Sequence, residues 1–144
     1  MLNSPLETSK ENSPRFCTAV NCMDGRVQLP IIAYLRKRFD CEYVDSITEG
    51  GPNLILAKQR DDSLVQSILA RLRISIENHN SLGIAIVGHY DCAANSESQP
   101  TQIAHIQQAA RFLKCQYHNL QVIGLWVDKH WIVHEVMEQN HSGN

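Results

Sequence analysis

Residues 81–92 read SLGIAIVGHYDC, and this stretch is the best single guide to the class of fold. Its apolar part, residues 82–88, is unbroken, which is typical of a strand buried on both faces of a parallel sheet. Such a strand needs helices on both sides of the sheet. Two side chains that can bind metal, His89 and Cys92, follow the apolar part at once.

Strand and helix patterns alternate along the rest of the chain. An apolar stripe from Leu64 to Ile76 predicts the longest helix, and Asp61 or Asp62 is expected to cap its start. The predicted strands cover residues 15–20, 41–48, 82–88 and 120–127, the predicted helices cover 30–39, 62–80 and 100–117, a turn covers 49–53, and a short edge strand covers 131–137. This alternation predicts an α/β fold with a central, mainly parallel β-sheet of four to five strands flanked by helices.

Length and composition limit the domain organisation and the kinds of partner. At 144 residues the chain is expected to form a single α/β domain over residues 15–144, preceded by a flexible N-terminal arm over residues 1–14. A formal net charge of −2 gives no reason to expect nucleic acid or an acidic membrane surface as a partner. The longest apolar stretches, about six residues, are far shorter than the roughly 20 that span a bilayer. With no secretory signal in view, we expect a cytoplasmic protein.

Three potential metal ligands are expected at one edge of the sheet. Cys22 follows the first predicted strand, and His89 and Cys92 follow the third. Ligands gather beyond the carboxyl ends of parallel strands, so these side chains meet if the two strands are neighbours. Two thiolates and one imidazole are suitable zinc ligands, and three protein ligands leave the fourth tetrahedral position open, as in a catalytic site. The domain is therefore expected to bind zinc.

An acidic and a basic residue lie close to the first of these ligands. Asp24 lies two residues after Cys22, and Arg26 lies two residues after Asp24. Two thiolates cancel the formal charge of Zn²⁺, so a zinc ion in this site acidifies water less than one held by three histidines. A carboxylate such as Asp24 can assist by accepting a hydrogen bond from water, and Arg26 can keep that carboxylate ionised and oriented. Taken alone, two such residues are more often a surface ion pair.

These two motifs together resemble those of the β-class carbonic anhydrases. The chain has Cys-x-Asp-x-Arg at residues 22–26 and Gly-His-x-x-Cys at residues 88–92, with a glycine-containing segment at residues 48–53 between them. The resemblance extends from about residue 15 to residue 137. It implies that Cys22, His89 and Cys92 bind zinc and that Asp24 and Arg26 form a catalytic dyad.

The resemblance also implies an activity and an assembly. The activity is the reversible hydration of carbon dioxide to bicarbonate and a proton, with zinc-bound hydroxide as the nucleophile. The assembly is a homodimer or homotetramer. Hydrolysis of carbonyl sulfide or carbon disulfide at the same site is an alternative. A second alternative is a zinc-binding relative that has lost catalysis and acts in interaction or regulation. Three departures from the family pattern, at Gly25, Glu49 and Ala93, keep this alternative open.

The remaining cysteines, histidines and tryptophans have simpler interpretations. Five cysteines and no export signal favour reduced thiols, and Cys17, Cys41 and Cys115 are interpreted as structural. A further group of histidines is expected to be mostly exposed and near the ends of elements; they are His105, His118, His130, His134 and His141. Trp126 and Trp131 are expected to pack in the core or at an interface.

Overall fold

The unbroken apolar stretch forms β3 (Gly83–His89), the middle strand of a five-stranded sheet with the order β2-β1-β3-β4-β5. All seven residues of β3 are buried. It pairs in parallel with β1 (Phe16–Cys22) and β4 (Gln121–Val127), and β1 pairs in parallel with β2 (Tyr43–Glu49). The short edge strand β5 (Val133–Glu135) is antiparallel to β4. The prediction of an α/β fold with a mainly parallel sheet is confirmed.

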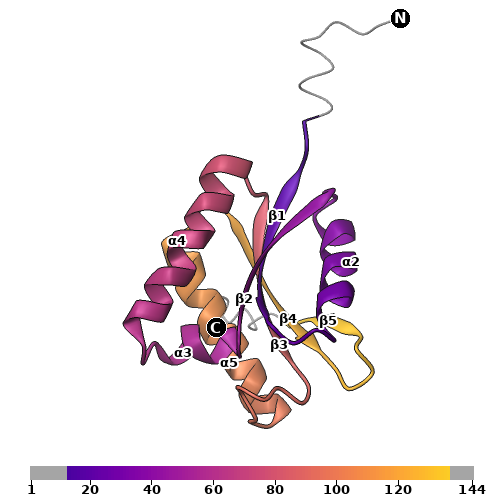
Figure 1. Cartoon of the computed structure of the whole chain (residues 1–144), viewed down its shortest axis with the longest axis vertical. Helices are drawn as coiled ribbons and strands as arrows, with labels where there is room; N and C mark the ends of the chain where they lie inside the picture. Colours follow the sequence, from indigo (N-terminus) through magenta and orange to yellow (C-terminus); the bar gives the residue numbers. More distant parts are fainter. Residues whose placement is uncertain (1–12, 137–144) are drawn as a thin grey trace, which may run out of the picture.

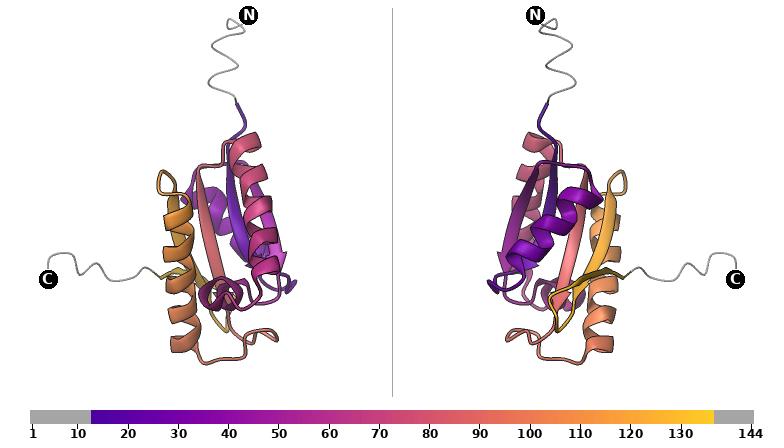
Figure 2. Two further views of the ribbon diagram at one scale, coloured as in Figure 1. Left: turned by 90° about the vertical axis from the view of Figure 1, so that its left-hand side faces the viewer. Right: turned by 90° about the vertical axis from the view of Figure 1, so that its right-hand side faces the viewer.

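Helices cover both faces of this sheet. In the computed structural model, which describes residues 13–136, α2 (Gln28–Arg38) lies on one face. The other face carries α3 (Pro52–Lys58), α4 (Asp62–His79) and α5 (Gln99–Gln116) (Figure 1). Figure 2 shows α4 and α5 in front of the sheet in one side view and α2 in front in the opposite view.

The alternation of side chains along each strand gives the molecule two apolar cores. In β3, Ala85 and Val87 point into the core that contains Ile31 and Leu35 of α2. Ile84 and Ile86 point into the core with α4 and α5. Burying one such aliphatic side chain contributes roughly 1.5–3 kcal/mol. Because both faces of β3 are covered, none of its positions faces water, and apolar residues do not have to alternate with polar ones along the strand.

Helix α3 was not predicted from the sequence. The segment 49–53 was interpreted as a turn, but the helix begins inside it, at Pro52. Gly51 precedes it with φ 60°, a left-handed conformation that glycine adopts at little cost, and the ring of Pro52 suits the first helical turn. A helix of seven residues is too short to give a clear period of apolar residues.

The other predicted elements are present, with shifted ends. β1 and β3 extend to Cys22 and His89, which were expected just beyond the strands. Helix α2 starts at Gln28 rather than at Pro30. Residues 1–12 of the predicted arm, the end of the predicted edge strand at Met137, and His141 lie outside the described residues. Within the described part, none of the helices combines the length and the apolar character needed to cross a membrane.

Candidate metal centre

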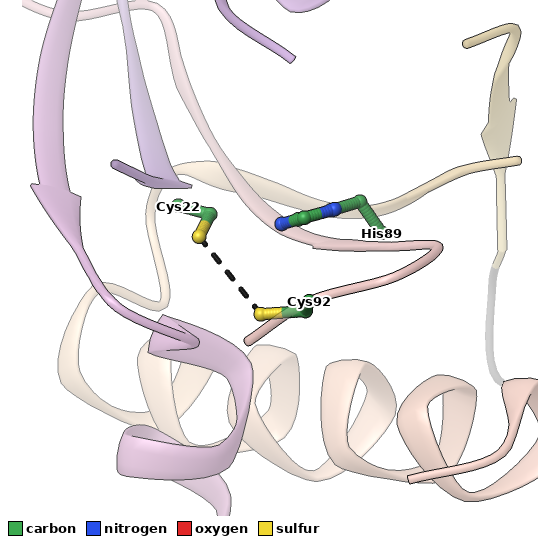
Figure 3. Close-up of side chains that lie close together, drawn as sticks. All are labelled: Cys22, His89 and Cys92. Atoms are coloured by element: carbon green, nitrogen blue, oxygen red, sulfur yellow. Dashed lines mark hydrogen bonds between the residues drawn. The ribbon is translucent and has the colours of Figure 1, made fainter. Parts of the chain in front are cut away.

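Two neighbouring strands end in metal-binding side chains. Cys22 is the last residue of β1 and His89 is the last residue of β3. The two strands pair directly, with Val20 opposite Ile86, so their ends lie at the same edge of the sheet. Cys92 follows β3 by three residues. Figure 3 shows the three side chains pointing toward one another, as the sequence predicted.

The three side chains fit a tetrahedral metal ion. Their ligand atoms all lie within 4.8 Å of one another, and the two sulfur atoms are 3.9 Å apart. Two sulfurs at about 2.3 Å from a tetrahedral zinc ion lie about 3.8 Å apart. Within residues 13–136 no other cluster of three such side chains is close enough to hold a metal ion.

His89 has an unpaired nitrogen, Nε2, that is available to bind a metal ion. Its Nδ1 lies 2.8 Å from the carbonyl oxygen of Tyr90, so Nδ1 carries the proton and donates it to that oxygen. Nε2 is then left as an acceptor, and it is buried without a hydrogen-bond partner. An unpaired buried acceptor is costly, and a cation would satisfy it. His89 is therefore oriented as a neutral metal ligand.

The surroundings of Cys22 favour its thiolate form. The hydrogen bond from the Cys92 thiol is the largest influence that holds the pKa of Cys22 well below its usual value. The side chain of His89 and the backbone N–H groups of Gly51 and Asp24 also lower the pKa of Cys22. The same hydrogen bond, followed by burial, raises the pKa of Cys92, although the N–H groups of Ala94 and Asn95 act in the opposite direction. Backbone N–H groups near both cysteines thus favour the thiolate forms that bind a metal ion.

Asp24 and Arg26 form a tight, bidentate ion pair beside these ligands. Arg26 donates from Nε to Oδ1 of Asp24 at 3.0 Å and from Nη2 to Oδ2 at 2.7 Å. The backbone N–H of Arg26 adds a bond to Oδ1 at 2.9 Å. These bonds lower the pKa of Asp24 to about 2. Asp24 is consequently an ionised acceptor near neutral pH, held by Arg26 and not grouped with the three metal-binding side chains.

Two further residues hold Arg26, and neither contact was clear from the sequence. Nη1 donates to Oδ2 of Asp91 at 3.2 Å, and Nη2 donates to the carbonyl oxygen of Asp91 at 3.1 Å. The guanidinium lies 4.6 Å from the centre of the Trp131 ring. Asp91 lies between His89 and Cys92 in the sequence, so the turn that carries these two ligands also carries a partner of Arg26. Trp131 lies far from Arg26 along the chain, so only the folded structure reveals this contact.

Comparison with known proteins places the chain in a family. A family model described as "putative carbonic anhydrase" matches residues 12–137. The chain belongs to the β-carbonic anhydrase family. The resemblance stated from the motifs at residues 22–26 and 88–92 is confirmed. None of the curated proteins that were compared matches the chain.

Solved β-carbonic anhydrases share the fold at low sequence identity. A tetrameric β-carbonic anhydrase of Sordaria macrospora is 12% identical with a TM-score of 0.57, covering 86% of this chain and 81% of that one. The enzyme CafA of Aspergillus fumigatus is 15% identical with a TM-score of 0.51, covering 90% and 84%. The β-carbonic anhydrase CcaA is 12% identical with a TM-score of 0.54, covering 94% and 83%. At these identities the likeness establishes the fold.

The three departures from the β-carbonic anhydrase pattern leave the site intact. Glu49 forms an ion pair with Arg71, so its charge is balanced. An alanine at position 93 is unfavourable only if its φ is positive, and Ala93 is not among the residues with positive φ; in this turn the left-handed residue is Asp91, with φ 60°. A Cβ atom placed on Gly25 meets no atom within 4 Å, so this position has room for a larger residue.

Several secondary expectations need correction. His105 is not exposed near a helix end; it lies within α5 and is 5% exposed. Cys115 is exposed, whereas Cys17 and Cys41 are buried as expected for structural thiols. The tryptophans agree with expectation: Trp126 packs in one core, and Trp131 is half-buried, packed against the other core and against Arg26.

Proposed function

We propose that this protein is a zinc-dependent carbonic anhydrase that hydrates carbon dioxide reversibly to bicarbonate and a proton. Cys22, His89 and Cys92 would hold the zinc ion, leaving one tetrahedral position open. The observation that carries the proposal is the buried, unpaired Nε2 of His89 facing two sulfurs 3.9 Å apart. A zinc ion bound there supplies Lewis acidity, which lowers the pKa of water and makes it a nucleophile.

Asp24 and Arg26 are proposed as the catalytic dyad. Three hydrogen bonds from Arg26 fix the position of the Asp24 carboxylate. Because this carboxylate is ionised, it can accept a further hydrogen bond but cannot donate one. An acceptor of this kind can orient the nucleophilic water toward the carbon of carbon dioxide. Arg26 in turn is held by Asp91 and Trp131, which limits the movement of the pair.

Replacing Asp24 by Asn tests this proposal. The amide keeps the size of the side chain but loses its charge, so we expect carbon dioxide hydration to fall by roughly 100-fold or more. Stopped-flow hydration with a pH indicator measures the activity, and metal analysis is expected to give one zinc per chain for both proteins. The control, Asp62→Asn, changes an exposed carboxylate on α4 and should leave activity unchanged.

The same assays decide between the proposal and its two alternatives. Sulfide release from carbonyl sulfide or carbon disulfide, without carbon dioxide hydration, would make the protein a hydrolase of the same family. A zinc-loaded chain that is silent in both assays would be a relative that has lost catalysis. Full activity in Asp24→Asn would show that the assignment of the dyad is wrong.

We also propose that the protein forms a homodimer or homotetramer. Four large apolar side chains are exposed at or beside the carboxyl edge of the sheet, where the candidate metal centre lies. They are Met23, Leu29, Tyr90 and Ile132, with exposed fractions of 67%, 78%, 48% and 56%. A second copy of the chain would remove this apolar surface from water.

A further inference from the structure

Two glutamines each bridge a chain segment that carries the candidate metal ligands. Nε2 of Gln28 donates to the carbonyl oxygens of Cys22 at 2.7 Å and Asp24 at 2.8 Å. Nε2 of Gln102 donates to the carbonyl oxygens of His89 at 3.0 Å and Asn95 at 2.8 Å. The two bridged segments, residues 22–24 and 89–95, contain all three candidate ligands. Each glutamine comes from the helix that follows its segment, α2 or α5.

The orientation of both amides is chemically determined. A carbonyl oxygen can only accept a hydrogen bond, so the NH₂ group of each glutamine must face its two carbonyls. The amide oxygens then face an asparagine in both cases. Oε1 of Gln102 accepts from Nδ2 of Asn53 at 3.2 Å, and Oε1 of Gln28 lies 3.4 Å from Nδ2 of Asn21. Each glutamine is therefore held from behind by an asparagine side chain.

Burial makes the bond set around Gln102 costly to break. Gln102 is 1% exposed, Asn53 is 0% exposed and Asn95 is 1% exposed, so water cannot replace a lost partner. Gly88 makes room for this amide pair, since a Cβ atom there would lie 2.6 Å from Nδ2 of Asn53 and 3.2 Å from Oε1 of Gln102. Gln28 is half-buried, and the same argument applies to it with less force.

The bridged segments also carry three of the four backbone N–H groups that lower the pKa of the two cysteines; the fourth belongs to Gly51. The backbone N–H of Asp24 lowers the pKa of Cys22, and those of Ala94 and Asn95 lower the pKa of Cys92. Gln28 holds the carbonyl of Asp24 and Gln102 holds the carbonyl of Asn95, so each amide fixes a peptide next to one of these donors. A shift of either segment would move a sulfur and its donors together.

We propose that Gln28 and Gln102 are positioning residues of the metal centre, which hold the ligand-bearing segments 22–24 and 89–95 in the geometry that metal binding requires. This inference rests on the proposed zinc site. It assigns neither glutamine a contact with substrate or metal. Its consequence is that loss of either amide weakens metal binding beyond any loss of folding stability.

Gln28→Met and Gln102→Met test the inference, because methionine is similar in length and cannot donate. We expect each variant to release Zn²⁺ to a chromogenic chelator about 10–100 times faster than the unaltered protein. We also expect the visible spectrum of the Co²⁺-loaded protein to change, since it reports tetrahedral geometry. Gln102→Glu, which keeps the size and loses the paired donor, serves if the buried methionine variant fails to fold.

Leu113→Val is the matched control. Leu113 is fully buried in α5 but packs in the apolar core and makes no bond to either segment, so its variant lowers stability alone. It should release zinc at the rate of the unaltered protein. Glutamine variants that release zinc no faster than Leu113→Val, with an unchanged cobalt spectrum, would overturn the inference.

The outcome separates this inference from the proposed activity. If the unaltered protein binds zinc but does not hydrate carbon dioxide, the proposed activity fails, and the release rates still decide the role of the glutamines. If the unaltered protein binds no zinc, the metal site and the inference fail together.

Discussion

Trp131 has a left-handed backbone conformation, with φ 63°, at the point where its ring meets Arg26. Such a conformation is unfavourable for a residue with a Cβ atom. The turn around it is held by Asp128, whose Oδ1 accepts from the backbone N–H groups of His130 and Ile132 at 2.8 and 3.0 Å. Unfavourable backbone conformations occur often beside functional sites, where surrounding bonds maintain them.

We predict that Trp131→Gly is more stable than Trp131→Ala by about 1 kcal/mol, because both lose the ring but only alanine keeps the unfavourable φ. Urea unfolding of the two variants measures the difference in the free energy of unfolding. Equal stabilities would mean that the turn relaxes when the ring is removed.

His105 has its protonation state determined by the amides around it. Nδ2 of Asn95 donates to Oδ1 of Asn53 at 3.3 Å and lies 3.1 Å from Nδ1 of His105. Nδ1 must therefore accept, and the ring is neutral with its proton on Nε2. Burial, followed by the positive charge of Lys58, lowers the pKa of His105; Arg60 adds to this and Glu97 opposes it.

We predict that ¹⁵N NMR will show the neutral Nε2–H tautomer of His105 at pH 6.5. Because the pKa is lower in the folded state, the unfolded chain takes up the proton first, and stability falls as the pH drops below about 6.5. His105→Gln, which keeps a neutral acceptor, should reduce this loss below about pH 6.5. Observation of the Nδ1–H tautomer would contradict the assigned orientation of Asn95.

At the scale of single elements, the start of α4 shows which of two candidate residues caps the helix. The sequence offers two adjacent carboxylates as caps, Asp61 and Asp62. The structure selects Asp61, whose Oδ1 accepts from the backbone N–H of Leu64 at 3.1 Å. Asp62 is the first residue of the helix, and its Oδ1 lies 3.4 Å from Nε2 of Gln66.

We predict that Asp61→Ala lowers the free energy of unfolding by about 1 kcal/mol, the usual effect of losing an N-cap. Asp62→Ala removes a carboxylate from the neighbouring position and should cost clearly less. Thermal or urea unfolding of the two variants gives the comparison, and equal losses would argue for a charge effect at the helix start in place of a cap.

Elements with a strong local pattern were predictable, and elements that depend on their neighbours were not. The apolar stretch that became β3 and the stripe from Leu64 to Ile76 carry their own signal. Helix α3 depends on the left-handed Gly51 and on contacts with α5, so residues 52–58 showed no pattern of their own. The last residues of β1 and β3 are held by pairing with other strands, Cys22 with Glu49 of β2 and His89 with Val127 of β4. The predicted strands therefore ended too early, two residues before Cys22 and one residue before His89.

At the scale of the whole molecule, the candidate site exists because the strand order differs from the chain order. β1 and β3 are neighbours although α2, β2, α3 and α4 separate them in the sequence. The motifs at residues 22–26 and 88–92 were enough to predict that Cys22, His89 and Cys92 meet. The bridging amides Gln28 and Gln102 were not predictable, because their contacts depend on side-chain rotamers and on how each helix sits against the sheet.

The exposed apolar side chains around the site lead to a prediction about assembly. Leu29 is the most exposed of the four apolar side chains near the carboxyl edge of the sheet, at 78%. If a second copy covers this surface, a charge at Leu29 must be desolvated in the interface, which is unfavourable. Leu29→Lys should therefore shift the protein toward monomers in size-exclusion chromatography with light scattering.

Ile74 supplies the matched control for this experiment. It is 59% exposed, but it lies on α4 on the opposite face of the sheet from α2. Ile74→Lys adds the same charge to a similarly exposed aliphatic position and should leave the molar mass of the unaltered assembly unchanged. A loss of mass in Ile74→Lys with none in Leu29→Lys would move the interface to the α4 face. An unaltered protein that is monomeric at every concentration would show that the apolar side chains around the candidate metal centre face water, since no second copy would then cover them.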